Sequence, residues 1–182
     1  MQKARVILEN AQFALTIERL CCQLVEEYDE FNNTYFVGVQ TGGVNLAVRL
    51  NSFLANNLNL PNIQLGKLDI TFYRDDFRSR NKPLVASSME MDFLVEGTRV
   101  ILVDDVLYTG RSIQAALTAL NHYGRPQSVE LLVLVDRRFN RNVPIQPDYT
   151  GIIVDTLDEA YVQVDWKESE GTDRVTLFPQ KK

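Results

Sequence analysis

The sequence predicts an α/β protein in which a parallel sheet is flanked by helices. Short apolar segments alternate along the chain with segments whose apolar residues recur at the helical period. The two most apolar runs, 100–103 and 129–135, have the composition of central strands that are covered on both faces. With 182 residues, of which 45% are hydrophobic, one substantial core is the simplest arrangement. We therefore expect a single domain over residues 1–182.

The first half of the chain predicts three strands and two helices. Strands are expected at 3–8, 35–39 and 63–71, and helices at about 10–28 and from Gly43 to about Leu58. The apolar side chains expected to face the core are Ala14, Ile17, Cys21, Leu24, Val25 and Tyr28 in the first helix and Ala47, Leu50, Leu54 and Leu58 in the second. Residues 74–91 are polar and basic, and we expect either disorder or a hairpin there.

The second half predicts a strand at 100–103, a helix, a strand at 129–135, and strand-like segments at 160–164 and 174–178. The helix is defined by four apolar residues at helical spacing, which are Ile113, Ala116, Leu117 and Leu120. Gly124 and Pro126 give an ordinary stop signal after it. No repeat or linker divides the chain.

Composition excludes several classes of function. A net charge of −5 does not favour nucleic-acid binding in general, although residues 74–82 carry a local charge of +2 that suits a small polyanion. No apolar run approaches the ~18 residues of a membrane span, and the N-terminus lacks the hydrophobic stretch of a signal peptide. Cys21 and Cys22 have no metal-binding spacing, so we expect free thiols, a cytoplasmic location and no membrane partner.

The most informative segment runs from Val100 to Ser112. Four apolar residues predict a buried strand, which we expect to end at the adjacent acids Asp104 and Asp105. The turn 109–112 then enters a helix, whose N-terminal N–H groups and dipole suit a phosphate. Carboxylates beside that cradle would accept hydrogen bonds from sugar hydroxyls or hold Mg²⁺, directly or through water. Because open parallel sheets bind ligands at this edge, the pattern predicts a ribose 5-phosphate site.

Two other phosphate-binding motifs do not fit the sequence. A Walker loop would need glycine in place of Asp105 and lysine in place of Arg111, and the dinucleotide fingerprint would need glycine at Gln40. The alternative for the acid pair is a solvated turn at a strand end.

The segment 104–111 resembles the motif that binds phosphoribosyl pyrophosphate (PRPP) in type I phosphoribosyltransferases. It is particularly similar to one branch, the pyrimidine-operon attenuation regulators that are also uracil phosphoribosyltransferases. The similarity extends from Ala4 to about Val164 and includes 70–76, 124–126 and 133–137. The resemblance implies a type I phosphoribosyltransferase fold with a flexible hood at about 72–92, and pyrimidine salvage in which uracil and PRPP give UMP and pyrophosphate. It also implies Mg²⁺, a homo-oligomer, and regulation of transcription by attenuation.

The same resemblance assigns roles to individual residues. Asp104 and Asp105 would be catalytic, holding the ribose hydroxyls and Mg²⁺, either directly or through substrate and water. The 5-phosphate would be bound by Tyr108, Thr109, Gly110, Arg111 and Ser112, the pyrophosphate by Thr41, Gly42, Gly43 and Arg74, and the base by Asp136 and Arg137. Tyr108 stands where purine salvage relatives have an acid that contacts the base, which favours a pyrimidine. Either Asp105 or the departing pyrophosphate would accept the uracil proton.

Several of these residues have a second interpretation. Residues 41–43 also fit a tight turn, 74–82 a solvated loop, and the pair 136–137 a surface ion pair. Gly42 departs from the family, which usually has an arginine there, so one cation that should face the pyrophosphate is missing.

Two alternative functions therefore remain open, a UMP-responsive RNA-binding attenuation regulator and a nucleotide sensor with weak catalysis.

The residues expected on the RNA face argue against the regulator. Positions where the family has basic and polar residues are occupied here by Glu18, Cys22, Phe139, Gln146 and Ile152, and the basic residues that remain are Arg19 and Arg138 or Arg141. Because acidic and apolar groups weaken phosphate contacts, we predict poor or absent binding of attenuator RNA. His122 lies late in a helix without partners for a catalytic triad, and we expect a surface group there.

Overall fold

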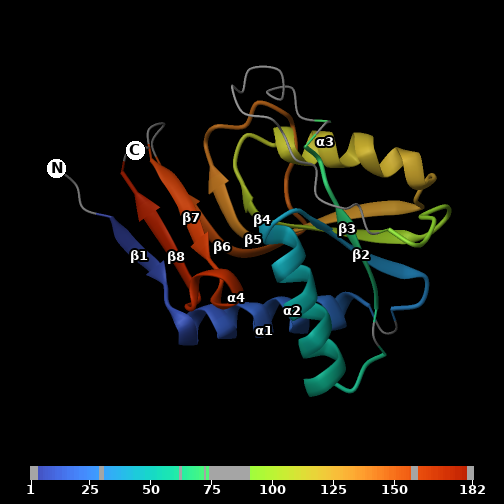
Figure 1. Cartoon of the computed structure of the whole chain (residues 1–182), viewed down its shortest axis with the longest axis horizontal. Coiled ribbons are helices and arrows are strands. Elements are labelled where there is room, and N and C mark those ends of the chain that lie inside the picture. The colour runs from blue at the N-terminus through green and yellow to red at the C-terminus, as the bar shows by residue number, and fades with distance from the viewer. Residues whose placement is uncertain are drawn as a thin grey trace.

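A parallel sheet of five strands forms the centre of the computed structural model, which describes residues 4–28, 31–61, 63–71, 73, 91–156 and 160–179. The strands lie in the order β3-β2-β4-β5-β6, and each neighbouring pair is parallel (Figure 1). Their bounds are β2 Thr34–Val39, β3 Gln64–Leu68, β4 Arg99–Leu107, β5 Ser128–Arg138 and β6 Tyr149–Asp155. The predicted fold class is confirmed, because a parallel sheet is flanked by helices. The strand β6 was not predicted.

Helices cover both faces of this sheet (Figure 1). On one face lie α1 (Asn10–Glu27) and α2 (Gly42–Asn57), and on the other α3 (Arg111–Leu120), which continues into the 3-10 turn η2 (Asn121–Tyr123). The strands alternate between the two cores: Ile101 and Val103 pack with α1 and α2, whereas Val100 and Leu102 pack with α3.

The face of α1 that is buried differs in part from the predicted one. Ala14 is exposed, and the buried positions of the helix are Phe13, Thr16, Ile17, Leu20, Cys21 and Leu24. In α2, Ala47, Leu50 and Leu54 are buried as predicted, while Leu58 lies after the helix and is 38% exposed. Within the described residues, no helix is both long and apolar enough to cross a membrane.

A second, antiparallel sheet of three strands packs beside the first, in the order β1-β8-β7 (Figure 1). Its strands are β1 Arg5–Leu8, β7 Tyr161–Asp165 and β8 Arg174–Phe178, and the short helix α4 (Lys167–Glu170) joins β7 to β8. All three strands were expected, but their separation from the parallel sheet was not. Leu8 and Val175 share one buried cluster with Phe13 and Ile101, so both sheets pack around α1.

Both central strands are longer than predicted, and this changes where the acids lie. The sequence places Asp104 and Asp105 at the end of a strand, whereas β4 continues to Leu107. Its pairing with β2 stops at Val103, opposite Gly38, while its pairing with β5 continues to Leu107, opposite Asp136. The acids are therefore inside β4 but directly beyond its last pair with the neighbouring β2.

The segment 136–137 is corrected in the same way, because β5 includes both residues and ends at Arg138. Continued pairing with β6 explains the extra length, since Asp136 lies opposite Ile153 and Arg137 opposite Val154. The predicted hood at about 72–92 falls outside the described residues except at 73, 91 and 92.

Candidate active site

The connection after β2 and the acids of β4 meet at the carboxyl edge of the parallel sheet. A Cβ atom added to Gly42 would overlap the carboxylate of Asp105 and would lie 2.9 Å from its Cβ. A Cβ atom added to Gly43 would overlap the Val103 carbonyl oxygen and would lie 2.9 Å from Asp104 Cα. The start of α2 therefore approaches β4 as closely as the backbone permits, and the tight approach requires both glycines.

Asp104 and Asp105 project on opposite sides of β4 because they are consecutive residues of a strand, but both follow the last residue of β4 that pairs with β2 and so lie at the edge of the sheet. Asp105 follows Ile101 and Val103 on the face covered by α1 and α2, in agreement with its contact to Gly42. Asp104 is 8% exposed and accepts a hydrogen bond at Oδ1 from the Asp105 N–H at 3.0 Å. The two carboxylates thus lie in different surroundings, which the sequence did not indicate.

Burial raises the pKa of the Asp105 carboxyl above its ordinary value, because desolvation disfavours the charged form. Hydrogen-bond donors oppose this rise without cancelling it. The Val106 N–H donates to Asp105 Oδ1 at 2.8 Å and so lowers the pKa in part.

The turn between β4 and α3 has the geometry of an anion cradle. Gly110 occupies the left-handed region, with φ of 85°, and is the residue before the first turn of α3. As the N-cap residue, Gly110 has no side chain that could cap α3, so the start of the helix offers N–H groups to an anion. Thr109 Oγ1 lies 3.4 Å from the Arg111 nitrogen, which donates to it.

The segment after β5 orients this turn by binding its carbonyl groups. The N–H groups of Asn142 and Val143 donate to the Thr109 carbonyl at 2.9 and 3.3 Å, and Arg141 Nη1 donates to the Tyr108 carbonyl. Because the carbonyls of Tyr108 and Thr109 are turned toward 141–143, this turn can present N–H groups to an anion. From the sequence, Arg141 was predicted only as a possible nucleic-acid contact, and its structural role was not foreseen.

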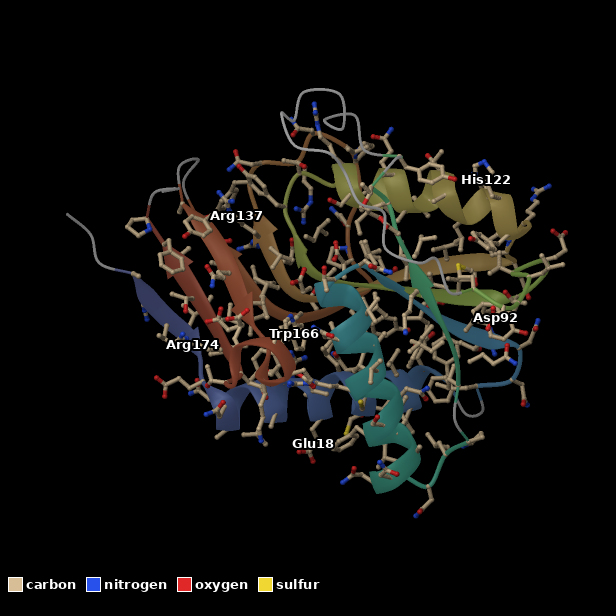
Figure 2. The ribbon with its side chains drawn as sticks, viewed as in Figure 1. Glu18, Asp92, His122, Arg137, Trp166 and Arg174 are labelled. Atoms are coloured by element: carbon tan, nitrogen blue, oxygen red, sulfur yellow. The ribbon has the colours of Figure 1, made fainter. Side chains whose placement is uncertain are left out.

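The two residues predicted to bind the base have different neighbours. Asp136 forms an ion pair with Arg141 and is 8% exposed. The Arg137 guanidinium lies 3.6 Å from the centroid of the Tyr108 ring, and its Nε donates to Thr156 Oγ1 at 2.7 Å. The surface ion pair considered as an alternative is therefore replaced by two buried side chains. Figure 2 shows Arg137 near the carboxyl ends of β5 and β6.

The structure brings together most of the predicted site. Gly42 and Gly43 are in contact with Asp105 and Asp104, and 108–112 follow directly on β4. Arg74, predicted to bind pyrophosphate, lies outside the described residues. His122 lies at the far end of α3, where its ring is 5.5 Å from that of Tyr73 (Figure 2).

A buried acid that sequence reasoning missed, Asp69, lies just after the end of β3, at the same edge of the sheet. Its Oδ1 accepts hydrogen bonds from the Thr71 N–H at 2.7 Å and the Thr71 hydroxyl at 2.5 Å. The Leu68 carbonyl accepts a hydrogen bond from the Gln40 N–H at 3.0 Å, which ties the loop after β2 to β3. The predicted strand 63–71 included Asp69, whereas β3 ends at Leu68, so the acid could have been identified only if the end of the strand had been predicted correctly.

The carboxylate oxygens of the site suit Mg²⁺ only if a bound phosphate ligand supplies further oxygens to the same ion. Among the described residues, no three histidine, cysteine or carboxylate side chains form a group that could hold a metal ion. Two carboxylates leave most of an octahedral shell to other oxygens, which water and a diphosphate can supply. The residues therefore fit an ion that arrives with its phosphate ligand.

The three basic side chains on the expected RNA face all have intramolecular partners. Arg19 donates to the carbonyls of Thr150 and Gly151, and Arg138 pairs with Asp155 at 2.7 and 2.6 Å. Arg141 pairs with Asp136. Each would have to exchange these contacts for phosphate contacts.

Comparison with known proteins gives concordant matches. The family described as the phosphoribosyl transferase domain matches residues 4–169. Proteins named "Bifunctional protein PyrR" are similar over nearly the whole chain. The one from Syntrophobacter fumaroxidans is 41% identical over 174 residues, covering 96% of this chain and 92% of its own. The one from Microcystis aeruginosa is 43% identical over 172 residues, covering 94% and 96%.

A solved structure with the same fold is the hypoxanthine phosphoribosyltransferase of Trypanosoma cruzi. Its TM-score is 0.71 at 18% identity, with 97% of each chain covered. A hypoxanthine phosphoribosyltransferase from Staphylococcus aureus gives a TM-score of 0.67 at 20% identity, covering 92% of this chain and 87% of its own. At these identities the structural likeness concerns the fold.

Proposed function

The chain belongs to the phosphoribosyl transferase domain family, and within it to the bifunctional PyrR proteins, and on this premise we propose that it forms UMP and pyrophosphate from uracil and PRPP. The observation that carries the proposal is the contact between two phosphate-sized loops and an acid pair. Gly42 lies against the Asp105 carboxylate, Gly43 lies against the backbone of Asp104, and β4 leads through Gly110 into the start of α3. A diphosphate, a diol and a monophosphate would occupy this edge in that order.

The 5-phosphate would anchor the sugar at the start of α3. N–H groups at 110–112 and the hydroxyls of Thr109 and Ser112 would donate to its oxygens. This interaction is remote from the reacting carbon, so its binding energy would orient the sugar for the transfer. The tie between the Thr109 carbonyl and 142–143 supports this role, because it keeps an acceptor away from the anion.

The acids would act on the ribose. C–N bond formation at the anomeric carbon passes through a state with oxocarbenium character, and nearby carboxylates stabilise that developing positive charge. Asp104 and Asp105 would also accept hydrogen bonds from the ribose hydroxyls. When bound, Mg²⁺ would neutralise charge on the departing pyrophosphate.

The base would lie near Tyr108 and Arg137. Arg137 is held in place by the Tyr108 ring and Thr156. A guanidinium N–H could therefore be presented to a uracil carbonyl with little further loss of side-chain entropy. The uracil N1 proton would pass to Asp105 or to the departing pyrophosphate. The raised pKa of Asp105 supports the first alternative, since a carboxylate of higher pKa is a stronger base.

Regulation of transcription through binding of attenuator RNA is a second candidate function. We propose that binding of attenuator RNA is weak in this chain, because Arg19, Arg138 and Arg141 are engaged in the fold. A UMP-responsive sensor with weak catalysis is the remaining alternative, and Gly42 favours it because a glycine brings no cation to the pyrophosphate.

Formation of UMP from labelled uracil, PRPP and Mg²⁺ tests the proposal, with Asp105→Ala beside the wild type. Asp148→Asn is the matched control, an acid variant on another segment. We expect uracil-dependent turnover that collapses in Asp105→Ala and persists in the control. Absence of turnover in wild-type protein that still binds UMP would favour the sensor.

We propose in addition that residues 1–182 act as one domain, in the cytoplasm and as a homo-oligomer. The buried cluster shared by the two sheets supports the single domain. The thiols of Cys21 and Cys22 are free, which fits a reducing compartment.

A further inference from the structure

Thr156 is a buried hydroxyl residue beside the arginine that would bind the base. It follows Asp155, the last residue of β6, and is 6% exposed. Its Oγ1 accepts a hydrogen bond from Arg137 Nε at 2.7 Å. No role was predicted for this threonine from the sequence.

The pairing of β5 with β6 brings the two side chains together. Arg137 lies opposite Val154, and Thr156 comes two residues after Val154. Because successive side chains of an extended chain alternate between its two sides, Thr156 lies on the same side as Val154 and can reach across to Arg137. The contact is therefore set by the register of two strands of the parallel sheet.

The Arg137 guanidinium is held in two directions. The residue is 4% exposed, and its Cζ lies 3.6 Å from the centroid of the Tyr108 ring. The ring contact alone would let the planar group turn over the face of the ring. The hydrogen bond from Nε to Thr156 fixes this remaining rotation, so the two contacts together set the plane of the guanidinium and the directions of its N–H groups.

Tyr108 is itself fastened at its backbone. Its carbonyl accepts a hydrogen bond from Arg141 Nη1, and Arg141 also forms an ion pair with Asp136. Tyr108 belongs to the turn that would bind the 5-phosphate. The Arg137 guanidinium is thus placed relative to the phosphate cradle, as the recognition of a base beside a bound sugar phosphate requires.

We propose that Thr156 is a positioning residue for the base, whose hydroxyl orients the Arg137 guanidinium so that its N–H donors face the carbonyl oxygens of uracil. This inference rests on the proposed function, in which Arg137 binds the base. A donor that is already oriented binds more tightly than a mobile one, because it loses less side-chain entropy when the base arrives. Loss of the hydroxyl should therefore weaken binding of the base and leave the bond-forming step nearly unchanged.

Thr156→Val is the direct test, because valine has a shape similar to that of threonine and lacks the hydroxyl. We expect the KM for uracil to rise about tenfold and kcat to change by less than about twofold, as for an interaction that binds the base equally before and during the reaction. Thr156→Ser keeps the hydroxyl and should restore most of the wild-type KM.

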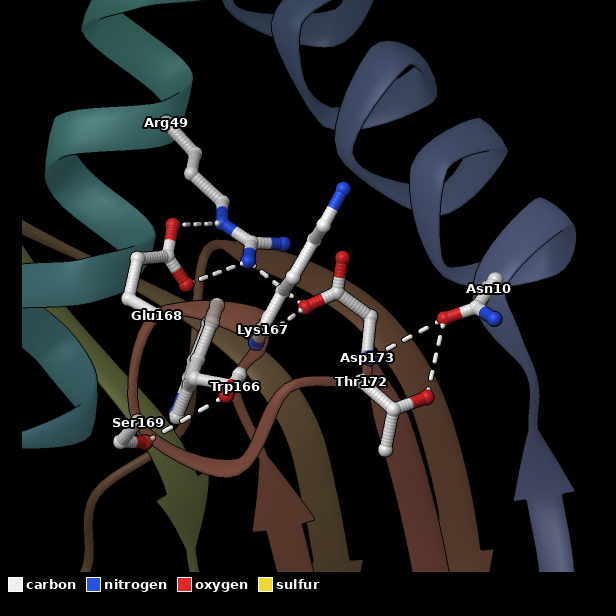
Figure 3. A network of polar contacts seen from close by, with 8 residues as sticks. All are labelled: Asn10, Arg49, Trp166, Lys167, Glu168, Ser169, Thr172 and Asp173. Carbon is white, nitrogen blue, oxygen red and sulfur yellow. Dashed lines mark hydrogen bonds and ion pairs between the residues drawn. The ribbon is translucent and has the colours of Figure 1, made fainter.

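Thr172→Val is the matched control. The Thr172 hydroxyl also donates to a side chain, Asn10 Oδ1 at 3.3 Å, in the polar network that joins the small sheet to α1 and α2 (Figure 3). In the same network Arg49 of α2 pairs with Glu168 and Asp173, each at 2.6 Å. The same chemical change made here should leave the KM for uracil at its wild-type value.

Ligand binding tests the proposal without turnover. UMP and ribose 5-phosphate share the sugar and the phosphate, so the difference between their affinities measures recognition of the base. We expect Thr156→Val to weaken UMP binding about tenfold and to change ribose 5-phosphate binding by less than about twofold. In an Arg137→Met background no guanidinium remains to be oriented, so Thr156→Val should change UMP affinity by less than about twofold.

The two kinds of measurement separate the proposed function from the role of Thr156. If the wild type made no UMP from uracil, the proposed function would fail, and the binding titrations would still decide the positioning role. That role would be overturned by equal losses for both ligands, by an unchanged UMP affinity, or by an equal loss with and without the Arg137 guanidinium. A wild type that binds UMP no more tightly than ribose 5-phosphate would also overturn it.

Discussion

The contact between Gly42 and Asp105 predicts that the cost of substituting the glycine, in unfolding free energy, depends on whether the Asp105 side chain is present. In Gly42→Ala the new methyl group would overlap the Asp105 carboxylate and lie 2.9 Å from its Cβ, where ordinary contacts are 3.4–4 Å. Relief requires the carboxylate to rotate out of its place. Overpacking of this kind costs about 1–3 kcal/mol of unfolding free energy. In an Asp105→Ala background the overlap with the carboxylate is gone and only the 2.9 Å contact to Cβ remains, so we expect the same substitution to cost about 1 kcal/mol less than in the wild type.

Gly43→Ala supplies the control for this cycle. Its methyl group would meet backbone atoms, the Val103 carbonyl and Asp104 Cα, which cannot rotate away. Its cost of about 1–3 kcal/mol should therefore be equal with and without the Asp105 side chain. The free energy of unfolding in urea measures all five variants on one scale. A cost of Gly42→Ala that is the same in both backgrounds would refute the assigned contact.

Three further predictions concern the rest of the fold. Burial, with smaller contributions from Cys22 and Glu18, raises the pKa of the Cys21 thiol to about 12, so a thiol reagent should label one cysteine in native protein and two after unfolding. Arg49 lowers the pKa of Glu168 and, despite burial, that of Asp173. The ion pairs of these two acids with Arg49 therefore stabilise the folded state above about pH 4.5, and this stabilisation is lost as the pH falls. Acid titration of stability should show this loss, on the order of 1 kcal/mol, in the wild type and not in Arg49→Met. Arg141→Met leaves Asp136 buried without its ion pair and should cost about 3 kcal/mol in urea unfolding, most of it recovered by a second change, Asp136→Asn. An additive effect of the two changes would contradict the pairing.

Local patterns predicted the parallel layer because its strands and helices are built from neighbouring residues. The runs 100–103 and 129–135 are apolar on both faces, and β4 and β5 are the central strands of the sheet. The acid pair was recognised because a strand, two acids and a turn follow one another in the chain. The extent of β4 could not be predicted, since its last residues are kept in the strand by pairing with β5 alone.

Features that depend on distant contacts were missed. The strands β1, β7 and β8 were each recognised, but nothing local shows that they pair with one another rather than with the parallel strands. Arg141 was read as a surface cation because its partners, the Tyr108 carbonyl and Asp136, are separated from it by 33 and 5 residues.

The choice of base tests the central claim most directly, because solved structures of this fold include hypoxanthine phosphoribosyltransferases. The measurement is pyrophosphate release from PRPP with Mg²⁺, in parallel reactions with uracil and with hypoxanthine. We predict release with uracil and none with hypoxanthine, since Tyr108 and Arg137 occupy the side of the site where the base would lie. Release with hypoxanthine and not with uracil would contradict the account.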